Sequence, residues 1–86
     1  MIEKKILIKN KTGIHSRPAN QLVKLCSKFK SNVNIISDGD EINAKSIIAL
    51  LSAGICQGAN ITLKVEGEDE AEAINTIYSF IDGLIE

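Results

Sequence analysis

The sequence predicts a two-layer α+β fold with the element order β-α-β-β-α-β-α. Segments in which apolar residues alternate with polar ones are interspersed with segments whose apolar residues repeat at helical spacing. Each predicted helix has one apolar face and the sheet has another, so the two layers bury these faces against each other. The turn signal Asp38-Gly39-Asp40 requires at least one antiparallel strand pair. From pattern alone, a ferredoxin-like arrangement is the nearest alternative.

The first strand is predicted over residues 2–8, and the polar residues 10–13 that follow are typical of a turn. A helix is predicted to begin at Ser16 or Arg17, because Pro18 is tolerated in a first helical turn. This helix is predicted to end at Asn32, with an apolar face made of Ala19, Leu22, Val23, Cys26 and Phe29.

Two short strands are predicted next, over residues 33–37 and 41–44, joined by the turn at Asp38-Gly39-Asp40. Ser46 precedes the compact apolar run 47–51. This run is predicted to form a short helix with Ser46 as its N-cap and Gly54 near its C-cap.

Residues 61–65 alternate between apolar and polar and predict a half-buried strand that ends at Gly67. Asp69, followed by Glu72 three residues later, resembles a capping box at the start of the last helix. The apolar face of that helix is predicted to contain Ile74, Ile77, Tyr78, Ile81 and Leu84.

Length and composition predict a single domain, residues 1–86, with an aliphatic core, because only 3% of the residues are aromatic. So few aromatic rings argue against a stacking platform for single-stranded nucleic acid. No apolar run approaches the roughly 18 residues of a membrane span. The protein is therefore expected to be cytoplasmic and to bind neither membrane nor nucleic acid.

The two cysteines, Cys26 and Cys56, lie in apolar segments and lack the spacing of metal ligands. Both are predicted to be buried free thiols, and a disulfide or redox pair is the alternative. No metal or other cofactor is expected.

Charge is distributed unevenly along the chain. Residues 4–37 contain eight basic residues and no acidic one, whereas residues 38–86 contain ten acidic residues and two basic ones. The surface around His15 is therefore predicted to be positive and to attract an anionic ligand or an acidic protein face. Solvated lysines without a partner are the alternative.

His15 is the single histidine of the chain, and a histidine side chain can act as a nucleophile near physiological pH. The unpaired N–H groups of the following helix, beginning with that of Ser16, and the helix dipole would support a phosphoryl group there. Arg17 offers a planar fork for phosphate oxygens, and Gly13 permits a positive φ or a close approach by a partner. The alternative for His15 is a polar surface residue or a helix cap. One histidine and scattered carboxylates do not make a self-contained enzyme, so a carrier is favoured.

Two motifs resemble those of one family. Gly13-Ile14-His15-Ser16-Arg17-Pro18-Ala19 resembles the active-site motif of HPr, the histidine-containing phosphocarrier of the bacterial phosphoenolpyruvate:sugar phosphotransferase system. Lys45-Ser46-Ile47-Ile48 resembles the motif around the regulatory serine of that family, and the resemblance extends over the whole chain.

The resemblance implies an open-faced β-sandwich, with a four-stranded antiparallel sheet and three helices on one face. It implies that His15 accepts a phosphoryl group from enzyme I on its Nδ1 and passes it to sugar-specific enzyme IIA domains. Arg17 would support the phosphohistidine.

Ser46 has two compatible interpretations. It is the predicted N-cap of a short helix, and in the HPr family the matching serine is phosphorylated by an ATP-dependent HPr kinase/phosphorylase in low-GC Gram-positive bacteria. This modification links sugar flux to a catabolite-control repressor. A matching serine also exists in relatives that lack the kinase.

The helix after Ser46 has more apolar surface than one buried face requires. Ile47, Ile48 and Leu51 are expected to form a docking patch for enzyme I and enzyme IIA, resembling that of the family, whereas Leu50 is expected in the core. Burial in the core is the alternative for Ile48. The polar residues predicted to complete this binding surface are Arg17, Asn20, Lys24, Lys28 and Lys45.

Two other functions remain as alternatives. One is a mainly regulatory HPr-like module that acts through Ser46 and the patch of Ile47, Ile48 and Leu51. A class of relatives with a regulatory serine but no active-site histidine is disfavoured, because His15 is present. The other is a small nucleic-acid-binding domain, against which the scarce aromatics and the acidic second half argue.

Overall fold

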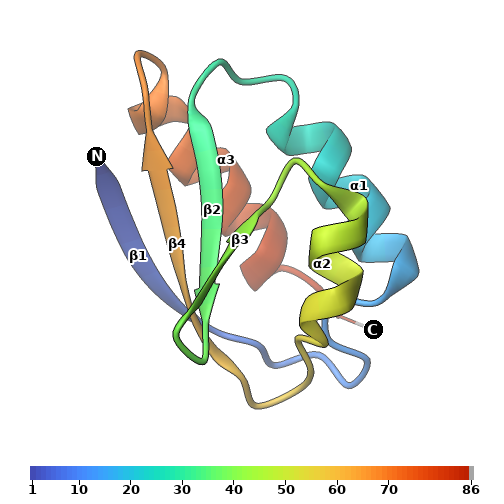
Figure 1. Cartoon of the computed structure of the whole chain (residues 1–86). Helices are drawn as coiled ribbons and strands as arrows, with labels where there is room; N and C mark the ends of the chain where they lie inside the picture. The colour runs from blue at the N-terminus through green and yellow to red at the C-terminus, as the bar shows by residue number, and fades with distance from the viewer. Residues whose placement is uncertain (86) are drawn as a thin grey trace.

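The computed structural model describes residues 1–85, in which three helices cover one face of a four-stranded sheet (Figure 1). The elements follow the predicted order and are β1 (Ile2–Leu7), α1 (Ser16–Cys26), β2 (Asn32–Ser37), β3 (Asp40–Asn43), α2 (Ile47–Ala53), β4 (Asn60–Glu66) and α3 (Glu70–Asp82). The α+β class and the three-helix, four-strand content are therefore confirmed.

The strand order of the sheet is β1-β4-β2-β3, and every neighbouring pair is antiparallel. The first strand thus lies at an edge, whereas a ferredoxin-like sheet would hold it in the interior. This order confirms the open-faced β-sandwich and excludes the ferredoxin-like alternative.

The core is aliphatic, as predicted. Ile61, Leu63 and Val65 of β4 point toward the helices and are buried, while Thr62 and Lys64 between them lie on the open face of the sheet. The alternation in the sequence identifies the buried face because successive side chains of a strand point to opposite sides.

The hairpin between β2 and β3 has a two-residue loop. Asp38 and Gly39 both adopt positive φ, at 51° and 84°, between the paired residues Ser37 and Asp40. This is the backbone of a type I′ turn, which matches the twist of the strands and favours Asp-Gly.

Helix α1 ends at Cys26, so the prediction that it continues to Asn32 is wrong. Its last turn tightens, because Lys28 N–H donates to the Leu25 carbonyl (3.2 Å) and Phe29 N–H donates to the Cys26 carbonyl (3.1 Å). Phe29 remains packed against the core although it lies outside the helix.

The backbone after α1 is held by a distant side chain. Lys30 N–H and Ser31 N–H donate to the carboxylate of Asp69 (2.8 and 3.0 Å), and the Ser31 hydroxyl donates to it as well. The Asp69 carboxylate therefore accepts hydrogen bonds from two backbone N–H groups that would bond within the helix if α1 were longer.

The predicted capping box at Asp69 and Glu72 is also wrong. Asp69 occupies the N-cap position of α3, but its side chain makes no bond within that helix. Glu70 instead accepts a hydrogen bond from Gly67 N–H (3.1 Å). The carboxylate of Asp69 is used to join the turn before α3 to the loop after α1.

Two smaller expectations also fail. Cys26 is buried as predicted, but Cys56 is exposed, because it lies in the loop after α2 and not in an element of the core. Leu84 lies beyond the end of α3 and is only half-buried.

We predict that Asp69→Asn lowers the free energy of unfolding at neutral pH. The Ser31 hydroxyl, followed by the backbone N–H of Lys30, holds the pKa of the Asp69 carboxyl below its ordinary value of 3.8. A lowered folded-state pKa gives stability that is complete above the unfolded-state pKa and is lost as the pH falls through the folded-state value. The difference between wild type and variant should therefore shrink below about pH 4, which urea unfolding at a series of pH values measures.

Glu70, whose pKa is also lowered, is present in both proteins and leaves this difference unchanged. Unfolding curves that stay equally far apart at every pH would contradict the role given to the Asp69 carboxylate.

Candidate functional site

His15 is the N-cap of α1, as one of the interpretations of the sequence anticipated. Its backbone is extended (φ −91°, ψ −168°), and its carbonyl accepts the first helical hydrogen bond from Ala19 N–H (2.8 Å). The helix begins at Ser16, which confirms the predicted start.

The loop that carries His15 is paired with the loop that follows α2. Ile8 N–H donates to the Ala59 carbonyl (2.9 Å), Gly58 N–H donates to the Ile8 carbonyl (2.8 Å), and Ile14 N–H donates to the Ile55 carbonyl (3.0 Å). The side chain of Ile14, the residue before His15, is only 4% exposed. His15 is therefore held by backbone bonds to a segment about 40 residues away in the sequence.

Gly13 allows the two loops to come this close. Its φ is 62°, and a Cβ there would lie 2.4 Å from the Ile55 carbonyl oxygen and 2.6 Å from Cys56 Cα. The expected positive φ is confirmed, and the close approach is to the backbone of this same chain.

Asn10 closes the loop and was missed in the sequence. Its side-chain Nδ2 donates to the Gly13 carbonyl (2.8 Å), and Gly13 N–H donates back to the Asn10 carbonyl (3.2 Å). Asn10 is only 6% exposed. Its signal in the sequence is an asparagine three residues before a glycine in a polar turn, where such side chains bond to nearby backbone.

The imidazole of His15 is half-buried, and its Nδ1 has no hydrogen-bond partner. Among residues 1–85, this atom is the one buried side-chain nitrogen or oxygen in that state. The side chain makes no capping bond to α1. This ring nitrogen thus lies unbonded beside the positive end of a helix.

The residues around His15 in the first turn of α1 differ in exposure. Ser16, Arg17 and Asn20 are exposed, and Asn20 Nδ2 donates to the Ser16 carbonyl (3.0 Å). Pro18 is buried on the inner side of the turn. The polar residues named from the sequence therefore lie on the solvent side of this turn.

Helix α2 has the caps that the sequence predicts. The Ser46 hydroxyl accepts a hydrogen bond from Ala49 N–H (3.2 Å), and Gly54 ends the helix with φ 62°. Ile48 and Leu51 are 75% and 44% exposed, Ile47 is half-buried, and Leu50 is in the core. The expected exposed apolar patch is thus formed mainly by Ile48 and Leu51.

Helices α1 and α2 lie side by side and run in opposite directions (Figure 1). Lys45, before α2, bonds to the Phe29 carbonyl after α1, whereas Ile55, after α2, bonds to Ile14 before α1. His15 and Ser46 are therefore at opposite ends of the helix pair. The seven residues of α2 correspond to about 10 Å of helix, with the exposed apolar side chains between the two ends.

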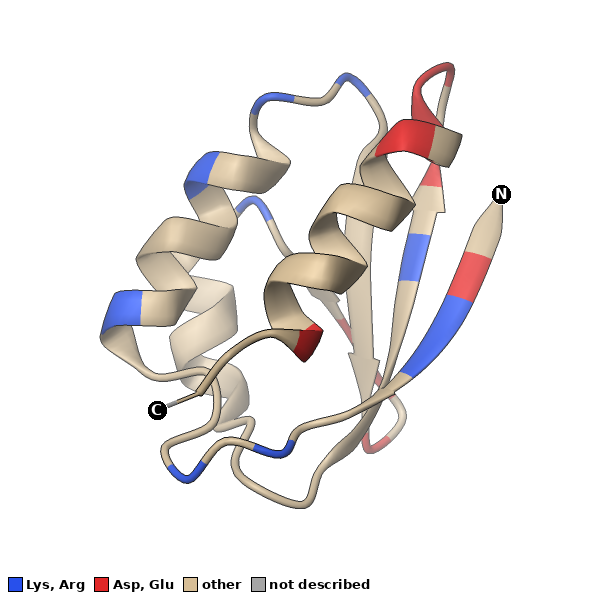
Figure 2. Cartoon of the chain, turned by 180° about the vertical axis from the view of Figure 1, so that it is seen from behind, with Lys and Arg blue, Asp and Glu red and all other residues tan. Residues whose placement is uncertain are grey.

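Basic residues lie along α1 and in the loops at its ends, whereas acidic residues gather around the start of α3 and the β4–α3 turn (Figure 2). Among the basic residues near α1, Lys9 pairs with Asp82 (3.0 Å) and Lys30 pairs with Glu68 (3.1 Å). Lys24 and Lys28 are exposed on and just after α1. The positive surface is therefore smaller than the sequence predicts, and it lies along α1.

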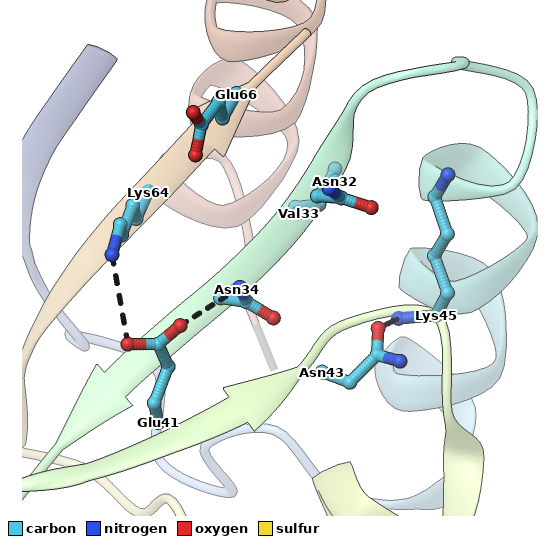
Figure 3. Close-up of a pocket in the computed structure, with 8 residues that line it drawn as sticks. All are labelled: Asn32, Val33, Asn34, Glu41, Asn43, Lys45, Lys64 and Glu66. Atoms are coloured by element: carbon cyan, nitrogen blue, oxygen red, sulfur yellow. Dashed lines mark hydrogen bonds and ion pairs between the residues drawn. The ribbon is translucent and has the colours of Figure 1, made fainter. Parts of the chain in front are cut away.

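Lys45 differs from the other predicted rim residues because it is half-buried and its Nζ donates to the Phe29 carbonyl (2.8 Å). It also lines a polar depression of about 190 Å³ on the open face of the sheet (Figure 3). There Glu41 accepts a hydrogen bond from Asn34 (2.9 Å) and pairs with Lys64 (3.7 Å). His15 does not line this depression, which lies on the face away from the helices.

Within residues 1–85, no three histidine, cysteine, aspartate or glutamate side chains are grouped so that they could hold a metal ion. None of the helices in that range is both long enough and apolar enough to cross a membrane.

Residues 2–82 match the family model described as "PTS HPr component phosphorylation site". The chain belongs to the HPr family. It is 45% identical over 78 residues to the phosphocarrier protein HPr of Mycoplasma pneumoniae, covering 90% of this chain and 89% of that protein. It is 44% identical over 82 residues to the HPr-like protein Crh of Halalkalibacterium halodurans, covering 95% and 98%.

Among solved structures, the chain is similar to HPr-C-His from Thermoanaerobacter tengcongensis, with a TM-score of 0.91 and 45% identity over 95% of this chain and 92% of that one. The family resemblance seen in the two motifs is thus confirmed, and so is the fold.

We predict that Gly13→Ala destabilises the protein by about 2–4 kcal/mol, because the new Cβ adds a backbone clash to a positive φ. Gly54→Ala is the matched control, since Gly54 has the same φ of 62° but nothing within 4 Å of an added Cβ. The control is expected to cost only about 1–2 kcal/mol. Urea unfolding measures both values, and equal losses would show that the close approach at Gly13 has no energetic weight.

Proposed function

We propose that this protein is a phosphoryl carrier of the phosphoenolpyruvate:sugar phosphotransferase system. It accepts a phosphoryl group from enzyme I on His15 and passes it to sugar-specific enzyme IIA domains in the cytoplasm. The observation that carries this proposal is the unbonded Nδ1 of His15 at the N-terminus of α1. Membership of the HPr family supports it.

The reaction at His15 is a displacement at phosphorus. The Nδ1 lone pair attacks, the new N–P bond forms, and the bond from phosphorus to the donor breaks with its electron pair staying on the donor. The attacking tautomer has its proton on Nε2, so no proton leaves Nδ1. Because Nδ1 is buried in the resting structure, the imidazole turns outward before an in-line attack.

The first turn of α1 supplies electrostatic support for the phosphoryl oxygens. The N–H of Ser16 points toward the helix start, and the helix dipole adds partial positive charge there. Arg17 is an exposed residue of this first turn, and its guanidinium would bind phosphate oxygens with its planar fork. These groups stabilise the phosphohistidine without making it unreactive, which is what a carrier requires.

The partners dock over α2 and α1. Ile48 and Leu51 provide an apolar centre, and Arg17, Lys24 and Lys28 provide a basic rim for acidic faces of enzyme I and enzyme IIA. Asn20 lies at the His15 end of this surface through its bond to Ser16. An exposed surface with an apolar centre suits a protein partner that brings its own active site.

We predict that phosphoenolpyruvate and enzyme I together place an acid-labile phosphoryl group on the wild type and none on His15→Ala. Arg17→Ala should be labelled about 10- to 100-fold more slowly, because it loses a charge-assisted hydrogen bond to phosphate. Labelled phosphoenolpyruvate and rapid quenching measure the rates, and circular dichroism checks that the variants are folded. A folded wild type that takes up no label would exclude the carrier function.

A second candidate function is a mainly regulatory module that acts through Ser46. Matching relatives have both kinds of name, phosphocarrier protein and HPr-like protein. A kinase such as HPr kinase/phosphorylase would add a charge of about −1.5 to −2 at Ser46, and a catabolite-control repressor would then recognise it. Because the hydroxyl lies at a helix N-terminus, the added phosphate is compatible with the fold.

We predict that Ser46→Asp weakens binding to enzyme I at least about fivefold, whereas Ser46→Asn does not. Both replacements are good N-caps, so both should keep the stability of α2 and differ only in charge. Ser46→Ala, in contrast, loses the bond to Ala49 and about 1 kcal/mol of stability. Titration calorimetry with enzyme I and urea unfolding measure these effects.

Equal binding by Ser46→Asp and Ser46→Asn would contradict an electrostatic switch at this position. If His15→Ala left sugar uptake intact in cells, the regulatory function would replace the carrier function.

A further inference from the structure

We infer that Pro18 is a positioning residue for phosphoryl transfer, because it withholds the backbone N–H that would otherwise occupy the Nδ1 lone pair of His15. The inference deepens the proposed function and rests on it. Its geometric part concerns only the resting protein and can be tested separately.

The first turn of α1 follows directly after His15. His15 is the N-cap, so Ser16, Arg17 and Pro18 are the first, second and third helical residues. An N-cap side chain ordinarily accepts a hydrogen bond from the backbone N–H of the second or third residue. At the third position of α1 this donor does not exist, since proline has no N–H.

The other short helix of the chain shows the bond that α1 lacks. The N-cap Ser46 of α2 accepts a hydrogen bond from Ala49 N–H, which is the third helical residue. At α1 the corresponding residue is Pro18, and the N-cap side chain makes no capping bond. The two helix starts therefore differ at the position whose N–H makes the capping bond in α2.

Pro18 is not required to close the first turn. That turn is closed by Ala19 N–H, which donates to the His15 carbonyl (2.8 Å). Any other residue at position 18 would bring an N–H with no partner within the helix. Because Pro18 is buried and Nδ1 is buried and unbonded, this N–H would gain most by bonding to Nδ1.

Such a bond would oppose phosphoryl transfer. The Nδ1 lone pair that attacks phosphorus would be shared with the N–H, and the bond would have to break before the imidazole turned outward. The bond would also be lost in the phosphohistidine, in which Nδ1 is substituted. Pro18 therefore favours both the rate of phosphorylation and the phosphorylated state.

The test compares wild type with two replacements of the same residue. Pro18→Ala adds the N–H, whereas replacement of Pro18 by N-methylalanine removes the ring without adding an N–H. The second variant is accessible by joining a synthetic peptide of residues 1–25 to residues 26–86 at Cys26. Circular dichroism and urea unfolding confirm that each protein is folded.

The first measurement is spectroscopic. In ¹⁵N-labelled Pro18→Ala, the amide of residue 18 should show a scalar coupling to His15 Nδ1 across a hydrogen bond. The second measurement is the rate of phosphorylation by enzyme I and phosphoenolpyruvate. We expect Pro18→Ala to be about three- to tenfold slower than wild type, as for the loss of one net hydrogen bond. The N-methylalanine variant should react within twofold of wild type.

The other outcomes contradict either this inference or the proposed function. Absence of the coupling in Pro18→Ala overturns the inference, and so does a coupled Pro18→Ala protein that reacts at the wild-type rate. Equal slowing by alanine and N-methylalanine would overturn it too, because the ring and not the missing N–H would then matter. A wild type that is never phosphorylated defeats the proposed function, while the coupling still decides whether Pro18 keeps Nδ1 unbonded.

Discussion

The site depends on the backbone pairing between the loop that enters α1 and the loop that leaves α2. Ile14 N–H and the Ile55 carbonyl form the bond nearest to His15, and Gly13 packs against the backbone at Ile55 and Cys56. These backbone contacts fix the direction in which the chain enters α1, independently of the side chains of the site. A functional side chain needs such backbone support to keep its position.

The same pairing also sets the distance between the two proposed sites, His15 and Ser46. Since α1 and α2 are antiparallel, His15 and Ser46 lie at opposite ends, separated by about the length of α2, roughly 10 Å. The Debye length at physiological ionic strength is about 8 Å, so a charge at Ser46 is largely screened at the imidazole. Under the proposed function, a phosphate at Ser46 would therefore act on partners that dock over the exposed Ile48 and Leu51 more than on the reactivity of His15.

Features that depend on nearby residues could be predicted from the sequence, and features that depend on distant ones could not. The alternation of Ile61, Leu63 and Val65, the caps Ser46 and Gly54, and the start of α1 are set by local periodicity and turn chemistry. The loop after α1 is held by Asp69, whose carboxylate accepts hydrogen bonds from N–H groups 38 and 39 residues away. In the sequence, Asp69 equally well resembles a cap for its own helix.

The starts of α1 and α2 differ in whether the N-cap side chain makes a stabilising hydrogen bond. A side-chain cap is worth about 1 kcal/mol, and α2 keeps its cap through Ser46 and Ala49. Helix α1 lacks the equivalent bond because Pro18 has no N–H. Its first turn is instead held by the hydrogen bond between Ile14 N–H and the Ile55 carbonyl. The backbone contacts between the two loops thus allow the N-cap side chain of α1 to remain unbonded, and an unbonded ring nitrogen is what a phosphoryl acceptor needs.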